Sequence, residues 1–263
     1  MVDGPIARFW EVDLLRGIAV ILMIIYHFFF DLDYLRIHEI DVTDGLPLIV
    51  ARTTVALFLL LVGLSVSLSH SRAQILGQES RFFRQLAMRS AWIMTLALSI
   101  TLVTYLVVGR GFIVFGVLHL IGLSLLFVYP FIGHYRRAFL FGLLFIMPGI
   151  YFNGISVDHP WLLWAGLAPE GFYSLDYVPL FPWFGVVLMG IGLGDVLYPD
   201  YKRRIALPEI SCNRLCNRLM RFFSILSKNS LAIYLVHQPL ILILLLLFFP
   251  DISLHAFKLP LQP

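Results

Sequence analysis

Seven runs of apolar residues, separated by polar stretches, set the pattern of this chain. Each run has about the 17–25 residues that an α-helix needs to cross the hydrocarbon core of a bilayer. The runs are Leu14–Phe30, Pro47–Ser69, Ala91–Val108, Phe112–Ile132, Ala138–Ile155, Val178–Leu197 and Leu231–Phe249. The fifth is the weakest, because Pro148 and Gly149 lie near its end. A further run, Trp161–Leu167, is too short to span and is predicted to be re-entrant or interfacial.

The composition indicates a membrane protein. Of the 263 residues, 60% are hydrophobic and only 13% are charged, whereas soluble domains are about 45–50% apolar and 25% charged. We therefore predict an all-α fold, a polytopic membrane helix bundle with about seven transmembrane helices, or eight if Trp161–Leu167 is extended. No long linker, repeat or low-complexity tract is visible, so residues 1–263 are expected to form a single domain. Arg16 interrupts the first run and no small-residue cleavage site follows it, so a cleaved signal peptide is not expected.

The distribution of charge predicts the orientation in the membrane through the positive-inside rule. With the N-terminus in the cytoplasm, fifteen of the 19 Lys and Arg side chains fall on the inner side, and nine of the 16 acids fall outside. An even number of spans would remove this separation, so seven spans are favoured. We expect a multi-pass protein of the cell membrane with membrane lipid as a partner. The basic inner surface indicates attraction to anionic lipid and gives no reason to expect nucleic acid.

Arg16 and His27 form the most informative pair of ionisable residues, because both lie within the first apolar run. Eleven residues of α-helix make three turns and about 20°, so the two side chains share one face and lie roughly 16 Å apart along the axis. Ionisable residues inside a membrane helix are costly and usually functional. This pair is suited to the two ends of one elongated ligand. The alternative is that Arg16 reaches the lipid headgroups and His27 is a packing residue.

Two further basic features are predicted on the cytoplasmic side. The loop His70–Ser90 contains Arg81 and Arg84, one helical turn apart, so their guanidinium groups can point the same way. Guanidinium groups bind phosphate through paired hydrogen bonds. The segment Cys212–Leu226 is amphipathic and is expected to lie along the inner leaflet.

The outer side is expected to be acidic. The loop Asp31–Leu46 contains five acids together with His38, and the loop Ser156–Tyr177 combines acids with Trp and Tyr. Carboxylates beside aromatic rings suit a sugar, but they equally suit a solvated loop with an interfacial aromatic belt. A few polar residues within the later spans are interpreted as interhelical hydrogen-bond partners: His119, Tyr234, His237 and Gln238.

Phosphate-binding arginines on the inner side and histidines further out suit a long, thin substrate such as acyl-CoA. A His can act as general base for transfer of the acyl group to an acceptor on the far side. A transporter of a small anion or lipid would use many of the same residues, and a non-catalytic membrane partner is a third hypothesis. Transporters often show internal repeats, and none is evident. Cys212 and Cys216 lie four residues apart in a basic loop, where we expect no disulfide. Without a His partner they make a poor zinc site, so no metal is expected there.

The segment Val12–Met23 resembles the opening of the heparan-α-glucosaminide N-acetyltransferase catalytic domain family. That family's Asp-x-x-Arg-Gly-Ile-Ala pattern is matched by Asp13 to Ala19. The family places an active-site Asn fourteen residues after the Asp, and its catalytic His eleven residues further on. This chain has His27 and His38 there, so His27 departs from the Asn of human-type members.

Other motifs resemble acyltransferase family 3. Arg16 and His27 match its Arg-x10-His motif, and Arg81 and Arg84 match its cytoplasmic Arg-x-x-Arg motif. Two further stretches are similar to both families, namely Phe181–Gly185 and the last helix with Ser230-Leu-Ala-Ile-Tyr-Leu-Val-His-Gln-Pro. No counterpart of the large lumenal domain of human-type relatives is expected here, so their heparan substrate is not carried over.

The resemblance implies a membrane acyltransferase that uses cytoplasmic acetyl-CoA, or another acyl-CoA, and acylates a sugar, amino sugar or similar acceptor outside. Arg16, Arg81 and Arg84 are expected to bind the CoA phosphates, and no metal is expected. His38 is expected to be the general base or a transient acyl carrier, with His27 positioning the thioester. The rival assignment makes His27 the base. The acceptor, the acyl chain length and the oligomeric state, a homodimer included, stay open.

Overall fold

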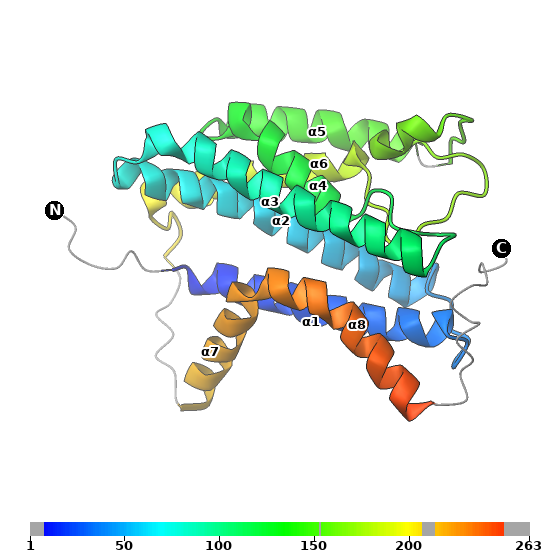
Figure 1. The fold of residues 1–263 in the computed structure, drawn as a ribbon. Helices are drawn as coiled ribbons and strands as arrows, with labels where there is room; N and C mark the ends of the chain where they lie inside the picture. Colours follow the sequence, from blue (N-terminus) through cyan, green and yellow to red (C-terminus); the bar gives the residue numbers. More distant parts are fainter. Residues whose placement is uncertain (1–7, 153, 207–213, 250–263) are drawn as a thin grey trace. The chain divides into compact units, whose positions relative to one another are not determined.

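The computed structural model describes residues 8–152, 154–206 and 214–249. Within those ranges every regular element is a helix, and two isolated β-bridges are the extent of strand-like pairing. The α-helices are α1 (Trp10–Tyr34), α2 (Gly45–Ile75), α3 (Glu79–Val107), α4 (Val117–Phe127), α5 (Tyr135–Phe152), α6 (Leu180–Leu197), α7 (Arg214–Lys228) and α8 (Ser230–Phe248) (Figure 1). The short 3₁₀ helices are η1 (Tyr129–Phe131), η2 (Pro160–Ala165) and η3 (Pro199–Tyr201). The predicted all-α fold is confirmed.

Five of the described helices are long and apolar enough to cross a membrane, namely α1, α2, α3, α6 and α8. The predicted span Phe112–Ile132 is not one continuous helix, because Gly116 is extended and η1 follows α4. With 11 residues, α4 is only about 16 Å long, against roughly 30 Å of hydrocarbon core. The fifth predicted span corresponds to α5, which contains Pro148. The count of seven spans therefore stays a prediction.

One of the shorter segments differs from expectation, and the re-entrant or interfacial placement of another, Trp161–Leu167, stays a prediction. The stretch His70–Ser90 is not a loop, because α2 continues to Ile75 and α3 begins at Glu79 after a three-residue turn. Arg81 and Arg84 thus lie on the first turns of a helix. The run Trp161–Leu167 is largely the 3₁₀ helix η2, which ends at Gly166 in a left-handed conformation.

By its contacts the chain divides into two compact units, and the boundary falls within α2. The first unit comprises Met1–Phe58 and Pro208–Leu261, and the second comprises Leu59–Leu207. Each unit is described by itself below. The single domain expected over residues 1–263 stays a prediction.

In the first unit, α1 packs against both α7 and α8, and Figure 1 shows α8 running alongside α1. A buried apolar cluster joins the C-terminal part of α1 to α8, and its members are Leu32, Leu35, Ile241 and Leu245. The chain then folds back after α1, because the amides of Ile37 and His38 both donate to the Leu32 carbonyl, at 2.9 and 3.3 Å. Burial of these leucines therefore places the His38 turn beside the last turn of α1.

The predicted amphipathic segment of this unit is the helix α7. Its basic residues Arg214, Arg218 and Arg221 are exposed, and so are the apolar Leu215 and Phe222. The expectation of no disulfide is wrong for Cys216, which is disulfide-bonded. Cys212 lies outside the described residues.

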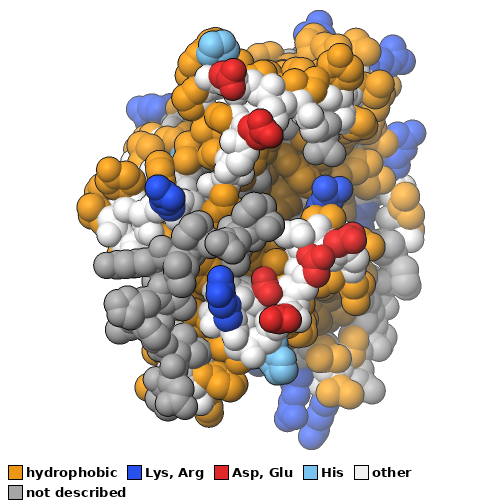
Figure 2. Space-filling view, turned by 90° about the vertical axis from the view of Figure 1, so that its right-hand side faces the viewer, with side chains coloured by type: hydrophobic (Ala, Val, Ile, Leu, Met, Phe, Trp, Pro, Cys, Tyr) orange, Lys and Arg blue, Asp and Glu red, His pale blue; other side chains and the backbone are white. Residues whose placement is uncertain are grey.

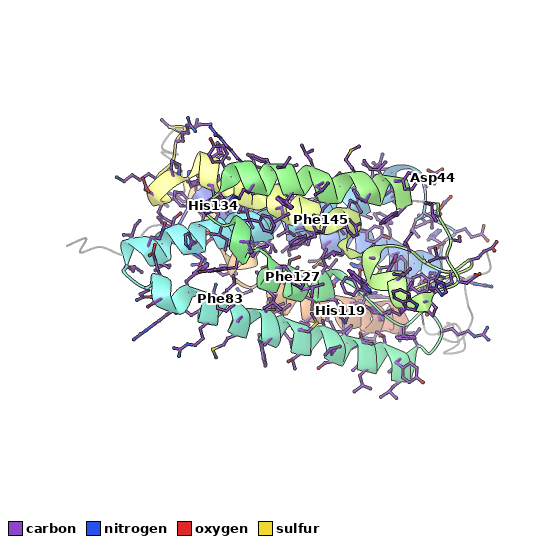
Figure 3. The ribbon with its side chains drawn as sticks, turned by 90° about the horizontal axis from the view of Figure 1, so that it is seen from above. Asp44, Phe83, His119, Phe127, His134 and Phe145 are labelled. Atoms are coloured by element: carbon purple, nitrogen blue, oxygen red, sulfur yellow. The ribbon has the colours of Figure 1, made fainter. Side chains whose placement is uncertain are left out.

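In the second unit, α6 packs closely against α2 and α5 through glycines. A Cβ atom on Gly63 of α2 would lie 2.9 Å from the Ile191 amide nitrogen, and one on Gly185 of α6 would lie 2.5 Å from the Gly142 carbonyl oxygen of α5. Phe145 of α5, labelled in Figure 3, stacks on Phe181 with ring centroids 4.9 Å apart. Small residues let helix backbones approach, which is the main route to tight packing in lipid.

Candidate functional site

The Asp13–Ala19 motif lies in the first turns of α1, and its side chains contact α7. The Ser227 hydroxyl donates to Asp13 Oδ1 at 2.7 Å, and the Ser224 hydroxyl reaches Asp13 Oδ2 at 3.3 Å. Arg16 donates to the Ser227 oxygen at 3.3 Å. A Cβ atom on Gly17 would lie 2.7 Å from Phe223 Cδ1 and 3.2 Å from the Phe223 carbonyl oxygen, so a larger residue here would press against α7. The acid, the arginine and the glycine of the motif therefore fasten α1 to α7.

A second polar group lies further along α1, where it meets α8. We call His27, Asp31, His237 and Gln238 the polar cluster. The rings of His27 and His237 meet edge to face with centroids 4.8 Å apart. One turn on, the Gln238 amide donates to Asp31 Oδ1 at 2.6 Å. His27 and Asp31 are four residues apart, so they share one face of α1 and meet neighbouring residues of α8.

The polar cluster is buried, yet much of its hydrogen-bonding capacity is unused. Asp31 is 1% exposed and His237 is 7% exposed. One buried atom of each member lacks a hydrogen-bond partner, namely His27 Nδ1, Asp31 Oδ2, His237 Nε2 and Gln238 Oε1. Buried polar atoms are nearly always satisfied in folded proteins, so a group of four points to a bound ligand or water.

The structure places His38 in an exposed turn just after α1. The acids around it have other partners: Asp31 meets Gln238, Asp33 accepts from the Ile40 amide at 3.0 Å, and Asp41 accepts from Thr43. The two hydrogen bonds from Thr43 also lower the pKa of Asp41. The described hydrogen bonds of Asp31, Asp33 and Asp41 therefore go to groups other than His38.

Arg81 and Arg84 belong to the second unit, where both are exposed near the start of α3. Between them, Phe82 is buried against His70 of α2, with ring centroids 5.1 Å apart. Packing of Phe82 therefore leaves the two arginines on the surface, as the one-turn spacing predicts. Of the predicted site residues, Arg16 and His27 lie on α1 and His38 lies in the turn after it. Arg81 and Arg84 lie in the second unit.

His119 has a structural role in the second unit. Its Nδ1 accepts from the Gly116 amide at 3.2 Å, and its Nε2 lies 3.1 Å from the Thr101 hydroxyl. The residue is 5% exposed at the start of α4, where Figure 3 labels it. With both ring nitrogens engaged, His119 is the interhelical hydrogen-bond partner that the sequence predicts.

The loop Ser156–Tyr177 is tied to the second unit by its C-terminal end. Asp176 accepts from the Val117 amide at 3.0 Å, which satisfies a free N–H at the start of α4. Tyr177 donates to the Leu163 carbonyl at 2.8 Å, and burial raises the pKa of Tyr177 to about 12. Trp161 remains 67% exposed. The face seen in Figure 2 carries exposed Asp and Glu side chains among apolar ones.

The sequence predicts His237 and Gln238 as polar residues of the last span, but it does not indicate that they contact α1. The signal was present in the four-residue spacing of His27 and Asp31, which puts a carboxylate on the same face as the histidine. Among residues 8–152, 154–206 and 214–249, no group of three His, Cys, Asp or Glu side chains is arranged to hold a metal ion.

Comparison with known proteins identifies the family of the chain. Neither the curated proteins nor the solved structures gave a match. The profile of the family described as heparan-alpha-glucosaminide N-acetyltransferase, catalytic, matches residues 8–239. The match includes the whole of α1, both Arg81 and Arg84, and all four members of the polar cluster. The chain therefore belongs to the heparan-alpha-glucosaminide N-acetyltransferase catalytic family.

Proposed function

We propose that this chain is an integral membrane acetyltransferase that takes its acyl group from cytoplasmic acetyl-CoA. Its acceptor is a sugar, an amino sugar or a similar molecule at the extracytoplasmic side. The observation that carries the proposal is the family match over residues 8–239. The N-terminus is cytoplasmic in this proposal, which agrees with the division of charge along the chain.

His38 is proposed as the general base. It is exposed, and the turn after α1 sets its backbone beside Leu32 and so close to the outer end of the polar cluster. A neutral imidazole can take a proton from an amine or hydroxyl near neutral pH. The acceptor atom then bonds to the acyl carbon, the carbon–sulfur bond breaks, and the acceptor proton passes to His38. Coenzyme A leaves as the thiolate and takes up a proton.

His27 is proposed to position the thioester. Its Nδ1 is buried without a hydrogen-bond partner, and the ring is held by edge contacts to His237 and Tyr26. A fixed ring nitrogen that carries a proton can donate to the carbonyl oxygen on which charge develops during acyl transfer. An Asn, as in human-type relatives, could donate to the same oxygen.

Arg81 and Arg84 are proposed to bind the CoA phosphates, with Arg16 as a further candidate. The two arginines of α3 are exposed and one turn apart, so both guanidinium groups are available to a phosphate. Arg16 has a packing role as well, because it donates to Ser227. A loss of CoA affinity on changing Arg16 would therefore combine a binding effect with a structural one.

Radiolabelled acetyl-CoA offered to the purified protein tests the proposal. Glucosamine serves as the acceptor, and N-acetylglucosamine, whose amine is blocked, serves as its control. We expect labelled N-acetylglucosamine from glucosamine alone. Label that stays on the protein without acceptor would identify an acyl carrier. Absence of transfer, hydrolysis and self-acylation together would contradict the proposal and favour a transporter or a non-catalytic partner.

A further inference from the structure

The unpartnered atoms of the polar cluster on α8 and on Asp31 are hydrogen-bond acceptors. His237 Nδ1 lies 2.7 Å from the Tyr234 carbonyl oxygen, and because a carbonyl only accepts, Nδ1 carries the proton. The neutral ring therefore offers Nε2 as an acceptor. Gln238 uses its amide N–H₂ on Asp31, so its unpartnered atom is the oxygen. Asp31 Oδ2 is an acceptor as well when the carboxyl group is ionised.

Asp31 is the acidic member of this set, and the described residues give it no ion pair. Its recorded partner is the neutral amide of Gln238, while only 1% of the residue is exposed. A buried carboxylate without an opposite charge is costly. A ligand that brings a positive charge and several N–H donors would satisfy Asp31 Oδ2, Gln238 Oε1 and His237 Nε2 together. An ammonium group has this chemistry, because it carries one charge and three donors.

We propose that Asp31, held in place by Gln238, binds the cationic amine of the acceptor. The inference rests on the proposed function and assigns the acceptor's amine to a defined place in it. Asp31 would hold the amine one residue from Leu32, whose carbonyl accepts from the His38 amide. His38, on the adjacent turn of chain, takes one proton from the ammonium group, which frees the nitrogen lone pair for attack on the thioester, and the second proton passes to the departing CoA thiolate. Gln238 acts as a positioning residue, since its hydrogen bond fixes the carboxylate.

Binding of glucosamine, measured without any turnover, tests the inference directly. Ligand that binds the folded state raises the Tm by mass action, so a titration followed by thermal unfolding in nanodiscs gives a Kd. Glucose, which has a hydroxyl in place of the amine, is the matched ligand. Asp31→Asn keeps the shape of the side chain and removes its charge. Glu39→Gln removes an exposed acid close by and serves as the control variant.

We expect wild type and Glu39→Gln to bind glucosamine alike and to bind glucose more weakly. Asp31→Asn should raise the Kd for glucosamine by about tenfold or more, as for a hydrogen bond to a charged group. Gln238→Leu should weaken glucosamine binding in the same direction, which provides a second variant if Asp31→Asn folds poorly. Equal binding of glucose and glucosamine by wild type, or unchanged binding by Asp31→Asn, would overturn the inference and leave the cluster to water.

The acetyl-transfer assay separates this inference from the proposed function. A wild type that binds glucosamine through Asp31 but transfers no acetyl group would remove the function and keep the binding site. Transfer by wild type with an unchanged KM for glucosamine in Asp31→Asn would keep the function and remove the binding site. For a positioning role of Gln238, the KM for glucosamine should rise while the KM for acetyl-CoA stays constant.

Discussion

The hydroxyl of Ser227 on α7 donates a 2.7 Å hydrogen bond to the Asp13 carboxylate on α1, although the two residues are 214 positions apart in the chain. The same oxygen accepts from Arg16 at 3.3 Å. A hydroxyl group can donate once and accept twice, so Ser227 serves both charged residues of the motif. The sequence motif that the chain shares with the family therefore also forms the contact between α1 and α7.

Replacing Ser227 by alanine should weaken the contact between α1 and α7. Asp13 is 8% exposed, and it would lose its shortest hydrogen bond while remaining buried. We expect the free energy of unfolding to fall by about 1–3 kcal/mol, the penalty for an unsatisfied buried group. Thermal unfolding in detergent measures the loss. Ser224→Ala is the comparison, because its 3.3 Å bond to Asp13 is longer and its effect should be smaller. Equal stability of Ser227→Ala and wild type would show that this contact does not contribute to the free energy of unfolding.

Replacing Gly17 by alanine should force α7 away from α1. The added Cβ would lie 3.2 Å from the Phe223 carbonyl oxygen and 2.7 Å from its ring. The ring can rotate aside, but the backbone oxygen can retreat only with the helix, so we expect a loss of about 1–3 kcal/mol. Leu15→Ala, on a side chain that is 41% exposed, is the control. A Tm for Gly17→Ala at or above that of the control would contradict the close contact.

Single replacements distinguish the proposed roles of His27 and His38. If His38 is the base, His38→Ala should abolish transfer while acetyl-CoA binding stays nearly intact. His27→Asn should keep measurable activity, because human-type relatives have Asn at this place. Full activity in His38→Ala together with an inactive His27→Asn would give the base role to His27. Transfer of label from acetyl-CoA and equilibrium binding of CoA are the two measurements.

Removal of Arg81 or Arg84 should weaken the binding of CoA. Loss of one guanidinium from a phosphate contact should cost about 1–3 kcal/mol. A Lys at either position should restore only part of the affinity, because the paired donors are lost. Isothermal titration with CoA provides the values, and Arg110→Ala, on the predicted outer side, is the control. Unchanged affinity in both variants would return the pair to a lipid-binding role.

The orientation in the membrane is tested by labelling single cysteines in a background without the native ones. Ser80 lies beside Arg81 at the start of α3, and Thr43 lies in the turn before α2. We expect an impermeant thiol reagent to label Thr43→Cys but not Ser80→Cys in intact cells. Labelling of Ser80→Cys under these conditions would reverse the predicted topology.

The hydrophobic runs by themselves determine that the chain is an all-α membrane protein, because a backbone exposed to lipid must satisfy its own hydrogen bonds. They also locate α1, α6 and α8 closely, whereas α2 continues past the predicted Ser69 to Ile75 and α3 begins at Glu79, well before the predicted Ala91. Periodicity does not decide where a helix is interrupted. The apolar run around α4 is interrupted at Gly116, whose amide meets His119 and whose neighbour Val117 meets Asp176. The contact of Val117 with Asp176 depends on a loop 59 residues further along the chain.

The candidate site divides in the same way. Placement of Arg16 and His27 on one helix follows from the sequence, since eleven residues of α-helix determine both their face and their spacing. The contacts between helices do not follow from the sequence. Asp31 is hydrogen-bonded to Gln238, 207 positions away, and Asp13 is hydrogen-bonded to Ser227, 214 positions away. No local propensity encodes such pairings. Only the packing of α7 and α8 against α1 decides that Asp31 faces Gln238 and that His27 faces His237.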